Sequence, residues 1–209
     1  MNPRIKICGL LDPGMAKCSA ELGADAIGLV FYPPSPRYVE AATAAQIVAA
    51  LPAFVSSVGL FVNADVTFVR NVLAKVPLDL LQFHGNETPE YCRQFGRPYL
   101  KALRVTPDLN LVECAQRFVD TLCKGILLDA FVEGVPGGTG EAFDWNLLPE
   151  HLPLPLVLSG GLHSGNVHEA ICKVRPWAVD VSSGVESSRG IKDAAKIAAF
   201  IKSSREKSA

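Results

Sequence analysis

Strand-like runs of this sequence end in side chains that can exchange a proton near neutral pH. These side chains are Cys8, His84, Asp129 and Asp180. Imidazoles, thiols and carboxyl groups are the side chains that enzymes use most for proton transfer. Whether they act together depends on the elements that place them.

The alternation of side chains along a strand indicates which of these groups share a face. Successive strand residues point to opposite faces, so Ile5 and Ile7 lie on one face while Lys6 and Cys8 lie on the other. In a barrel the apolar face meets the outer helices, and the polar side chains point inward. The same test turns four further side chains inward, namely Gln82, His84, Asp129 and Asp180. Polar groups from four strands are therefore predicted to converge at one mouth.

Each of these residues also has a purely structural interpretation. Cys8 could be a small buried apolar group, and Asp129 or Asp180 could be a satisfied hydrogen-bonding group. Gln82 and His84, which precede Gly85, could cap the next turn. Convergence favours a site over these alternatives, because buried polar groups cost desolvation unless a ligand or water uses them.

The elements that would position these groups alternate between strand and helix along the whole chain. Asp12 and Pro13 form an N-cap and first turn, Met15, Cys18 and Leu22 follow at helical spacing, and Gly23 ends the helix. After the first strand, the predicted strands are 24–31, 54–62, 78–84, 98–104, 123–130, 154–159 and 177–182. The predicted helices include 43–50, 65–75 and 88–95, and a last helix with the apolar stripe Ile191, Ala194, Ala195, Ala198 and Ile201.

Eight strand-helix units in 209 residues predict a closed (β/α)8 barrel, with an open doubly wound sheet as the alternative. No linker or low-complexity segment interrupts the pattern. We therefore expect one domain over 1–209, with a frayed tail over 203–209.

Two glycine-containing turns are suited to an anion. Ser-Gly-Gly-Leu (159–162) follows the seventh predicted strand, and Ser-Ser-Gly-Val-Glu (182–186) follows the eighth. Glycine lets backbone N–H groups approach a ligand, and a helix start adds a favourable partial charge. Barrel phosphate sites lie after these two strands, so the pair predicts a phosphate site.

Two loops complete the predicted mouth. Pro-Pro-Ser-Pro-Arg (33–37) is rigid, so it can present Arg37 at little entropic cost, and arginine grips a carboxylate with two hydrogen bonds. The alternative is a solvated surface arginine. The longest loop, 131–144, follows Asp129 and is predicted to be a mobile cover.

Composition excludes several classes of protein. The formal net charge of −1, with no basic block, does not provide the cationic surface of a nucleic-acid binder. No apolar run reaches the roughly 18 residues of a membrane helix, and no signal peptide precedes the first strand. The six cysteines show no zinc-site spacing, so we interpret them as reduced thiols in a cytoplasmic protein. The oligomeric state, monomer or homodimer, stays open.

The motifs, taken in order, resemble the phosphoribosylanthranilate isomerase family over nearly the whole chain. They are Lys-Ile-Cys-Gly-Leu (6–10), Pro-Pro-Ser-Pro-Arg-Tyr-Val (33–39), Val-Gly-Leu-Phe-Val-Asn (58–63), Leu-Gln-Phe-His-Gly-Asn-Glu (81–87), Leu-Leu-Asp-Ala (127–130), Gly-Gly-Thr-Gly (137–140) with Phe-Asp-Trp (143–145), Ser-Gly-Gly-Leu (159–162), and Asp-Val-Ser-Ser-Gly-Val-Glu (180–186) leading to Lys-Asp (192–193).

The resemblance implies an Amadori rearrangement of a phosphosugar aminoaldose to an aminoketose, without cofactor or metal. It implies that Cys8 is the general base, that Asp129 is the general acid, and that Arg37 holds the anthranilate carboxylate. It further implies a phosphate site at Gly160, Gly161, Ser183 and Gly184, and a pocket lined by Lys6, Gln82, His84 and Asp180.

That chemistry makes opposite demands on two groups. Cys8 must become a thiolate, so its pKa should be lowered, and Lys6 is the candidate partner. Asp129 must hold a proton, so burial should raise its pKa. The sequence departs from the family at Leu11, where Thr or Ser is usual, and at 187–190, where a proline-glycine turn is usual.

Three rival functions remain at this point. One is the aminoaldose isomerase of histidine biosynthesis, which uses a carboxylate where this chain has Cys8. Another is a noncatalytic phosphosugar-binding barrel, which intact Cys8 and Asp129 disfavour. The third is a thiol nucleophile formed by Cys8 with His84.

Overall fold

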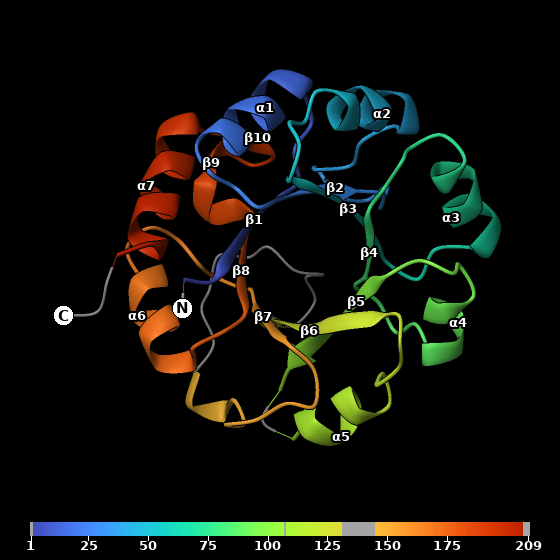
Figure 1. The fold of residues 1–209 in the computed structure, drawn as a ribbon, viewed down its shortest axis with the longest axis vertical. Helices are drawn as coiled ribbons and strands as arrows, with labels where there is room; N and C mark the ends of the chain where they lie inside the picture. The colour runs from blue at the N-terminus through green and yellow to red at the C-terminus, as the bar shows by residue number, and fades with distance from the viewer. Residues whose placement is uncertain (1, 107, 131–144, 207–209) are drawn as a thin grey trace.

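Eight parallel strands close into a barrel in chain order, surrounded by α-helices (Figure 1). The computed structural model describes residues 2–106, 108–130 and 145–206. Strand β1 pairs with β2 on one side and with β8 on the other, which closes the sheet. The predicted (β/α)8 barrel is therefore confirmed, and the open doubly wound sheet is excluded.

The barrel strands are short and regular. Their bounds are Arg4–Cys8 (β1), Ala26–Val30 (β2), Ser56–Phe61 (β3), Leu80–Phe83 (β4), Tyr99–Val105 (β5), Cys123–Ala130 (β6), Leu156–Leu158 (β7) and Ala178–Val181 (β8). The helices are Pro13–Glu21 (α1), Ala41–Ala49 (α2), Val66–Leu73 (α3), Pro89–Arg93 (α4), Leu111–Gln116 (α5), Val167–Val174 (α6) and Ala194–Ser204 (α7).

Helix α1 begins and ends where the sequence indicates. The side chain of Asp12 accepts a hydrogen bond from the backbone N–H of Met15 at 2.8 Å, and Pro13 occupies the first turn. Gly23 follows the helix with φ +110°, a conformation that favours glycine. The local capping prediction is confirmed.

The C-terminal part of the chain differs from the prediction in three ways. Among the described residues, only a 3-10 turn, Trp145–Leu147 (η1), lies between β6 and β7. Ile191 is not helical; with Lys192 it forms β10, which pairs with β9 (Glu186–Ser188) as a hairpin outside the barrel. The buried side chains of α7 are Ile197, Phe200, Ile201 and Ser204, because the helix starts later than predicted and its inner face is rotated.

The tail is also more ordered than predicted over its first residues. Helix α7 continues to Ser204, which is buried and donates a hydrogen bond to the carbonyl of Phe200 at 2.8 Å. Arg205 donates to the carbonyl of Gly23 at 2.6 Å. Fraying therefore does not begin at 203, and 207–209 lie outside the described residues.

The two faces of the barrel sheet carry different side chains, as alternation predicted. Ile5, Ile7 and their outward equivalents on other strands join the helices in the main hydrophobic core. A separate apolar plug fills the barrel interior, formed by Leu100, Ala102, Leu127, Val157 and Ala178.

The plug gives way to polar side chains toward the C-terminal ends of the strands. On β6 and β8, the inward residue two positions after the plug is Asp129 or Asp180, and Ser159 occupies the same place just after β7. The sequence thus builds an apolar floor and a polar layer above it with a period of two.

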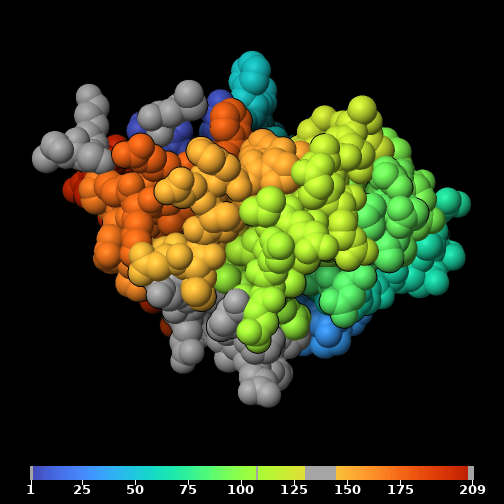
Figure 2. All heavy atoms as spheres, turned by 90° about the horizontal axis from the view of Figure 1, so that it is seen from below, coloured from blue at the N-terminus to red at the C-terminus, as the bar shows by residue number. Residues whose placement is uncertain are grey.

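Figure 2 shows one flank of the molecule. There the yellow-green surface of α5 adjoins the yellow-to-orange surface of 145–175. Over the residues that the structure describes, the search for an apolar helix long enough to cross a bilayer finds none.

Candidate active site

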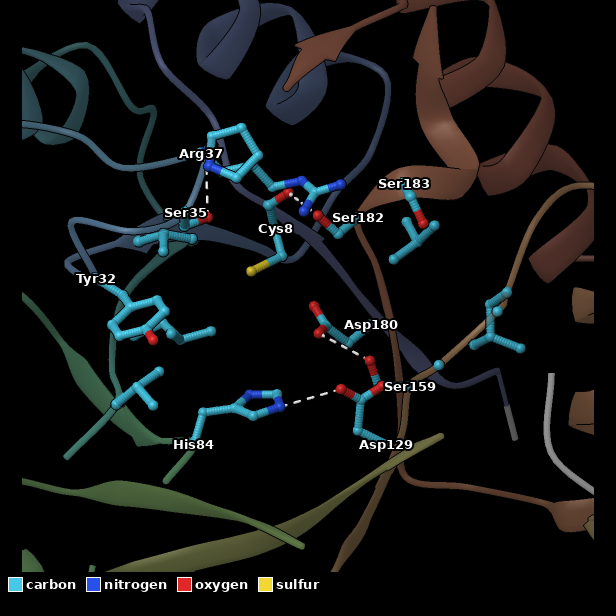
Figure 3. Close-up of a pocket in the computed structure, with 18 of the residues that line it drawn as sticks. Cys8, Tyr32, Ser35, Arg37, His84, Asp129, Ser159, Asp180, Ser182 and Ser183 are labelled. Carbon is cyan, nitrogen blue, oxygen red and sulfur yellow. Dashed lines mark hydrogen bonds and ion pairs between the residues drawn. The ribbon is translucent and has the colours of Figure 1, made fainter. Parts of the chain in front are cut away.

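A cavity of about 300 Å³ opens at the C-terminal ends of the barrel strands. Figure 3 shows Cys8 on one side of this cavity and the pair formed by His84 and Asp129 on the other. The polar lining residues come from the ends of strands and the loops that follow them: Cys8, Tyr32, Ser35, Arg37, His84, Asp129, Ser159, Asp180, Ser182, Ser183 and Arg189. The predicted convergence of polar groups is confirmed.

Cys8 ends β1 with its thiol against β2. A side chain at Gly28, its register partner, would place a Cβ 2.7 Å from Cys8 Sγ, so glycine there makes room for the sulfur. Burial raises the pKa of Cys8 above its ordinary value, and the charge of Asp180 raises it further. The Lys6 and Lys192 ammonium groups act in the opposite direction. Lys6 therefore favours the thiolate as predicted, but the predicted lowering of the Cys8 pKa is wrong, because burial outweighs the two ammonium groups and the net shift is upward.

Lys6 and Asp180 form a buried ion pair between β1 and β8. They are register partners, and Lys6 Nζ lies 2.8 Å from Asp180 Oδ1. Ser159 donates to the second oxygen, Oδ2, at 3.3 Å. Burial acts to lower the pKa of Lys6, but the charges of Asp180 and Cys8 outweigh it, so the pKa is raised and the ammonium is held.

Asp129 is fixed by a chain of hydrogen bonds that starts on β4. Gln82 Nε2 lies 3.0 Å from His84 Nδ1, and His84 Nε2 lies 3.0 Å from Asp129 Oδ2. As the amide is oriented, Gln82 donates to Nδ1, so the neutral imidazole carries its proton on Nε2 and donates it to Asp129. Oδ2 is then occupied, and Oδ1 is the oxygen that remains for a ligand.

Two predicted pocket residues have a different position from the one expected. Among the described residues that line the cavity, Lys6 and Gln82 do not occur. Both are buried one layer below, where Lys6 supports Asp180 and Gln82 supports His84. The alternation of side chains gave the correct face of each strand but not the depth, which depends on where each strand ends.

The predicted anion turns lie side by side at the cavity. Gly160 and Gly161 have φ +85° and +65°, two successive left-handed residues that only glycine adopts readily. These two glycines and Ser183 line the cavity. Gly184 does not line it; its Cα packs against the Leu162 carbonyl, where a Cβ would clash, so glycine there lets the two turns meet.

Arg37 lines the cavity and is bound by a carboxylate of the chain itself. Its Nε and Nη2 donate to the two oxygens of Glu186 at 2.6 and 2.9 Å. Lys192 Nζ donates to Glu186 Oε1 at 2.7 Å. Burial alone raises the pKa of Glu186, but the hydrogen bonds from Arg37 and Lys192 outweigh it and bring the pKa to about 2. The loop-borne arginine is therefore not a free surface cation.

Sequence reasoning assigned no role to Glu186, Lys192 or Arg189. Glu186 and Arg37 are 149 residues apart, so no local pattern connects them. Arg189 lies in the hairpin turn between β9 and β10 and lines the cavity with an exposed side chain. Two signals were available: these residues follow the eighth strand, and the motif at 180–186 leading to 192–193 contains Glu186 and Lys192.

Three further sequence predictions concern the cysteines, a metal site and the loop 131–144. None of the six cysteines, all of which the structure describes, forms a disulfide. No group of three or more His, Cys, Asp or Glu side chains suited to a metal occurs in the described ranges. The loop 131–144, predicted to be a mobile cover, lies outside the described residues, together with the motif at 137–140.

The chain matches a family model over 5–203, that of N-(5'phosphoribosyl)anthranilate (PRA) isomerase. It is 54% identical to an N-(5'-phosphoribosyl)anthranilate isomerase from Nitrosospira multiformis over 202 residues, which covers 97% of this chain and 96% of that protein.

Solved structures show the same likeness. The phosphoribosyl anthranilate isomerase of Thermotoga maritima superposes with a TM-score of 0.87 at 41% identity, over 97% of this chain and 98% of that one. A second such isomerase, in complex with reduced 1-(o-carboxyphenylamino)-1-deoxyribulose 5-phosphate, gives a TM-score of 0.80 at 38% identity, over 97% and 98% of the two chains.

Proposed function

The chain belongs to the N-(5'-phosphoribosyl)anthranilate isomerase family and is an isomerase of tryptophan biosynthesis; from this premise we propose that Cys8 and Asp129 carry the two proton transfers of its reaction. The observation that carries the proposal is that both side chains line one cavity from opposite sides (Figure 3). A ribose between them can meet a base on one side and an acid on the other.

The two anionic ends of the substrate set its orientation. We place the phosphate at the turns of Gly160, Gly161 and Ser183, and the anthranilate carboxylate at Arg37. Gly184 contributes by holding the two turns together. The ribose then spans the region between Cys8 and Asp129. The bound product analogue of the solved relative carries both a phosphate and a carboxyphenyl group, which agrees with a site of this polarity.

Ring opening is the first step of the proposal. Protonated Asp129 gives its proton from Oδ1 to the furanose ring oxygen while the C1′–O bond breaks, and the nitrogen lone pair forms the C1′=N bond. His84 holds Oδ2 at 3.0 Å, which keeps the reacting oxygen directed to the cavity. His84 is thus a positioning residue for the acid, and Gln82 sets its tautomer.

Proton abstraction from C2′ is the second step. The Cys8 thiolate takes this proton, the electron pair forms the C1′=C2′ bond, and the C1′=N pair returns to nitrogen. The resulting enolamine becomes the aminoketose when C1′ gains a proton and the C2′ hydroxyl releases its proton to solvent. Lys6 and Lys192 stabilise the thiolate, whereas burial and Asp180 oppose it. Only the deprotonated fraction of Cys8 acts as the base, so the rate should rise with pH.

Two features argue for this assignment over its rivals. Both ring nitrogens of His84 bond elsewhere, to Gln82 and Asp129, so a Cys8–His84 nucleophile is not supported. Position 8 carries a thiol, not the carboxylate of the histidine-pathway isomerase. We further propose a reducing cytoplasm as the compartment, since no disulfide joins the six cysteines that the structure describes.

A turnover assay tests the proposal. Fluorescence of the anthranilate group follows loss of N-(5'-phosphoribosyl)anthranilate with wild type, Cys8→Ala and Asp129→Asn. We expect each substitution to lower kcat by about a thousandfold or more, with KM changed by much less, because the lost interactions act in the transition state. Binding of the reduced product analogue should persist in both variants.

The outcomes separate the parts of the proposal. A variant that keeps near-normal kcat contradicts the role given to that residue. Arg37→Ala should chiefly raise KM, and an unchanged KM removes the carboxylate assignment. A wild-type protein without turnover contradicts the reaction itself.

A further inference from the structure

Arg37 is already paired with a carboxylate of its own chain, and the proposed reaction does not explain why. A residue proposed to bind the substrate carboxylate already forms a two-point contact with a carboxylate of its own chain, Glu186. The contact is 2.6 Å from Arg37 Nε to Glu186 Oε1 and is almost excluded from solvent. Either Glu186 blocks the arginine, or it prepares the arginine for a second partner.

The hydrogen bonds around Glu186 are all of one kind. Besides Arg37, its carboxylate accepts from Lys192 Nζ at 2.7 Å and from the Gly190 N–H at 3.1 Å. All three of these partners are hydrogen-bond donors. The site therefore requires an acceptor with two oxygens, and the amide of a glutamine would direct its NH₂ at one of these donors.

Within the described part of the chain, no other side chain hydrogen-bonds the remaining edge of the guanidinium, so that edge can take a ligand. Arginine has five N–H donors in a planar fork, and Glu186 uses only the Nε and Nη2 edge. The Arg37 side chain crosses Gly9 so closely that a Cβ there would lie 2.7 Å from Arg37 Cδ. Packing on one side and Glu186 on the other fix the plane of the guanidinium in the cavity wall.

While Cys8 is an uncharged thiol, as its raised pKa favours, the buried charges around Glu186 do not cancel. Arg37 and Lys192 contribute two positive charges and Glu186 one negative charge, all within hydrogen-bond contact. The neighbouring pair of Lys6 and Asp180 is balanced. One uncompensated positive charge is costly in a poorly solvated place unless an anion neutralises it.

We propose that Glu186 is the positioning residue of the carboxylate site. By holding one edge of Arg37 while sharing itself with Lys192, it directs the other edge to the cavity and leaves a surplus of one positive charge for a single ligand carboxylate. This inference rests on the proposed carboxylate role of Arg37. It adds a specificity determinant, because a substrate without the carboxylate leaves the surplus charge unpaired.

Two possible roles of Glu186, positioning Arg37 and lowering the local positive charge, predict opposite effects of the substitution Glu186→Gln. If Glu186 only lowered the local charge, Glu186→Gln would make the cluster more positive and bind the substrate carboxylate more tightly. If Glu186 positions Arg37, Glu186→Gln releases the arginine and weakens that binding. Glu186→Asp keeps the charge but shortens the reach, so a positioning role predicts weaker binding for it as well.

The experiment compares two substrates. One is N-(5-phosphoribosyl)anthranilate and the other is N-(5-phosphoribosyl)aniline, which lacks only the carboxyl group. The measured quantity is the ratio of their kcat/KM values, called here the discrimination ratio. We expect wild type to favour the first substrate by at least about a hundredfold, and Glu186→Gln and Glu186→Asp each to lower the ratio by about tenfold or more.

A second substitution tests the charge count. Lys192→Met removes the surplus charge but leaves the contact of Arg37 with Glu186. It should also lower the discrimination ratio, although kcat falls for both substrates because Lys192 stabilises the Cys8 thiolate. The ratio cancels that shared effect, and an unchanged ratio would contradict the charge count.

Matched controls separate folding from recognition. Glu87→Gln changes an equally buried glutamate, paired with Lys101 at 2.8 Å outside the cavity-lining residues, and should leave the ratio as in wild type. Thermal melts establish that the assayed variants are folded at the assay temperature. A ratio lowered equally by Glu87→Gln would reduce the Glu186 effect to general destabilisation.

The failure of this inference is distinguishable from failure of the proposed function. If Arg37→Ala lowers the ratio but Glu186→Gln raises it or leaves it unchanged, Glu186 has no positioning role and the carboxylate assignment stands. If neither Arg37→Ala nor the Glu186 variants change the ratio, the assignment of Arg37 itself is wrong. If Arg189→Ala is the only variant that lowers the discrimination ratio, then Arg189, and not Arg37, binds the substrate carboxylate.

Discussion

The two ends of the barrel use carboxylates in different ways. At the N-terminal ends of the strands, Asp25, Asp79 and Asp120 each accept hydrogen bonds from backbone N–H groups at 2.7 to 2.9 Å. Asp25 also pairs with Arg4, whose side chain is exposed to solvent. At the C-terminal ends, Asp180 and Glu186 pair with the cations of Lys6 and Arg37, beside the cavity.

The size of the cavity at each end does not indicate which end binds a ligand. A cavity of about 980 Å³ lies at the N-terminal end, larger than the one at the C-terminal end, and its lining includes Arg4, Arg175 and the half-exposed Trp177. Its charged side chains are largely solvated, whereas the smaller cavity gathers buried ones. Polar groups satisfied by the backbone serve the fold, and buried charges that face a cavity serve a ligand.

The largest expected effect follows from breaking the buried pair at the C-terminal end. Lys6→Met leaves Asp180 as an uncompensated buried charge, so the free energy of unfolding should fall by about 3–5 kcal/mol. Lys6 contributes the largest lowering of the Cys8 pKa, so without it this pKa should rise further. Less of the thiolate is then present at a given pH, and kcat should also fall. Denaturant unfolding and steady-state kinetics measure the two effects.

A surface lysine provides the matched control for that change. On the exposed face of α1, Lys17 Nζ lies 3.8 Å from Glu21 Oε1. Lys17→Met should lower the free energy of unfolding by less than about 0.5 kcal/mol and leave kcat unchanged. If Lys6→Met were as mild as this control, the C-terminal end would not depend on its buried charges.

The next effect is a dependence of stability on pH. Glu186 has a pKa of about 2 in the folded protein and about 4.3 in the unfolded chain, so its contribution is fully present above pH 5 and is lost as the pH falls toward 2. Between these limits wild type should lose about 3 kcal/mol more than Glu186→Gln. Unfolding curves at a series of pH values measure the difference, and parallel losses would contradict the low pKa.

A smaller effect is expected at the N-terminal end. Asp79 accepts from both the backbone N–H and the hydroxyl of Ser57, each at 2.8 Å. Asp79→Asn should lower the free energy of unfolding by about 1–2 kcal/mol and leave kcat and KM unchanged. Asp108→Asn, at an exposed position, is the control for stability. A large loss of kcat in Asp79→Asn would erase the distinction between the two ends.

Local sequence patterns predicted the barrel and most of its mouth. Alternation placed Cys8, Asp129 and Asp180 correctly inside, because the period of two is a property of any strand. The capping of α1 by Asp12 was also predicted, because the cap and the N–H group that it accepts from lie within one turn of the helix. Family resemblance added the roles that spacing alone cannot give.

The remainder depends on contacts between distant segments. Ile191 continued an apolar pattern into α7, but it belongs to the β9–β10 hairpin, whose formation depends on Glu186 and the turn at Gly190. Lys6 acts on Cys8 as expected, but its ion pair with Asp180, 174 residues away, was not predicted. Pairings of this kind are set by barrel closure, which no short stretch of sequence encodes.

The pH dependence of kcat/KM in wild type and Cys8→Asp tests most directly whether position 8 supplies the base. In wild type the rate should rise with pH to above the ordinary thiol pKa of about 8.5, because burial raises the pKa of Cys8. In Cys8→Asp the same limb should move down by several pH units, following the lower pKa of a carboxyl group. A limb that stays in place when residue 8 changes, or near-normal turnover by Cys8→Ala, would contradict the account.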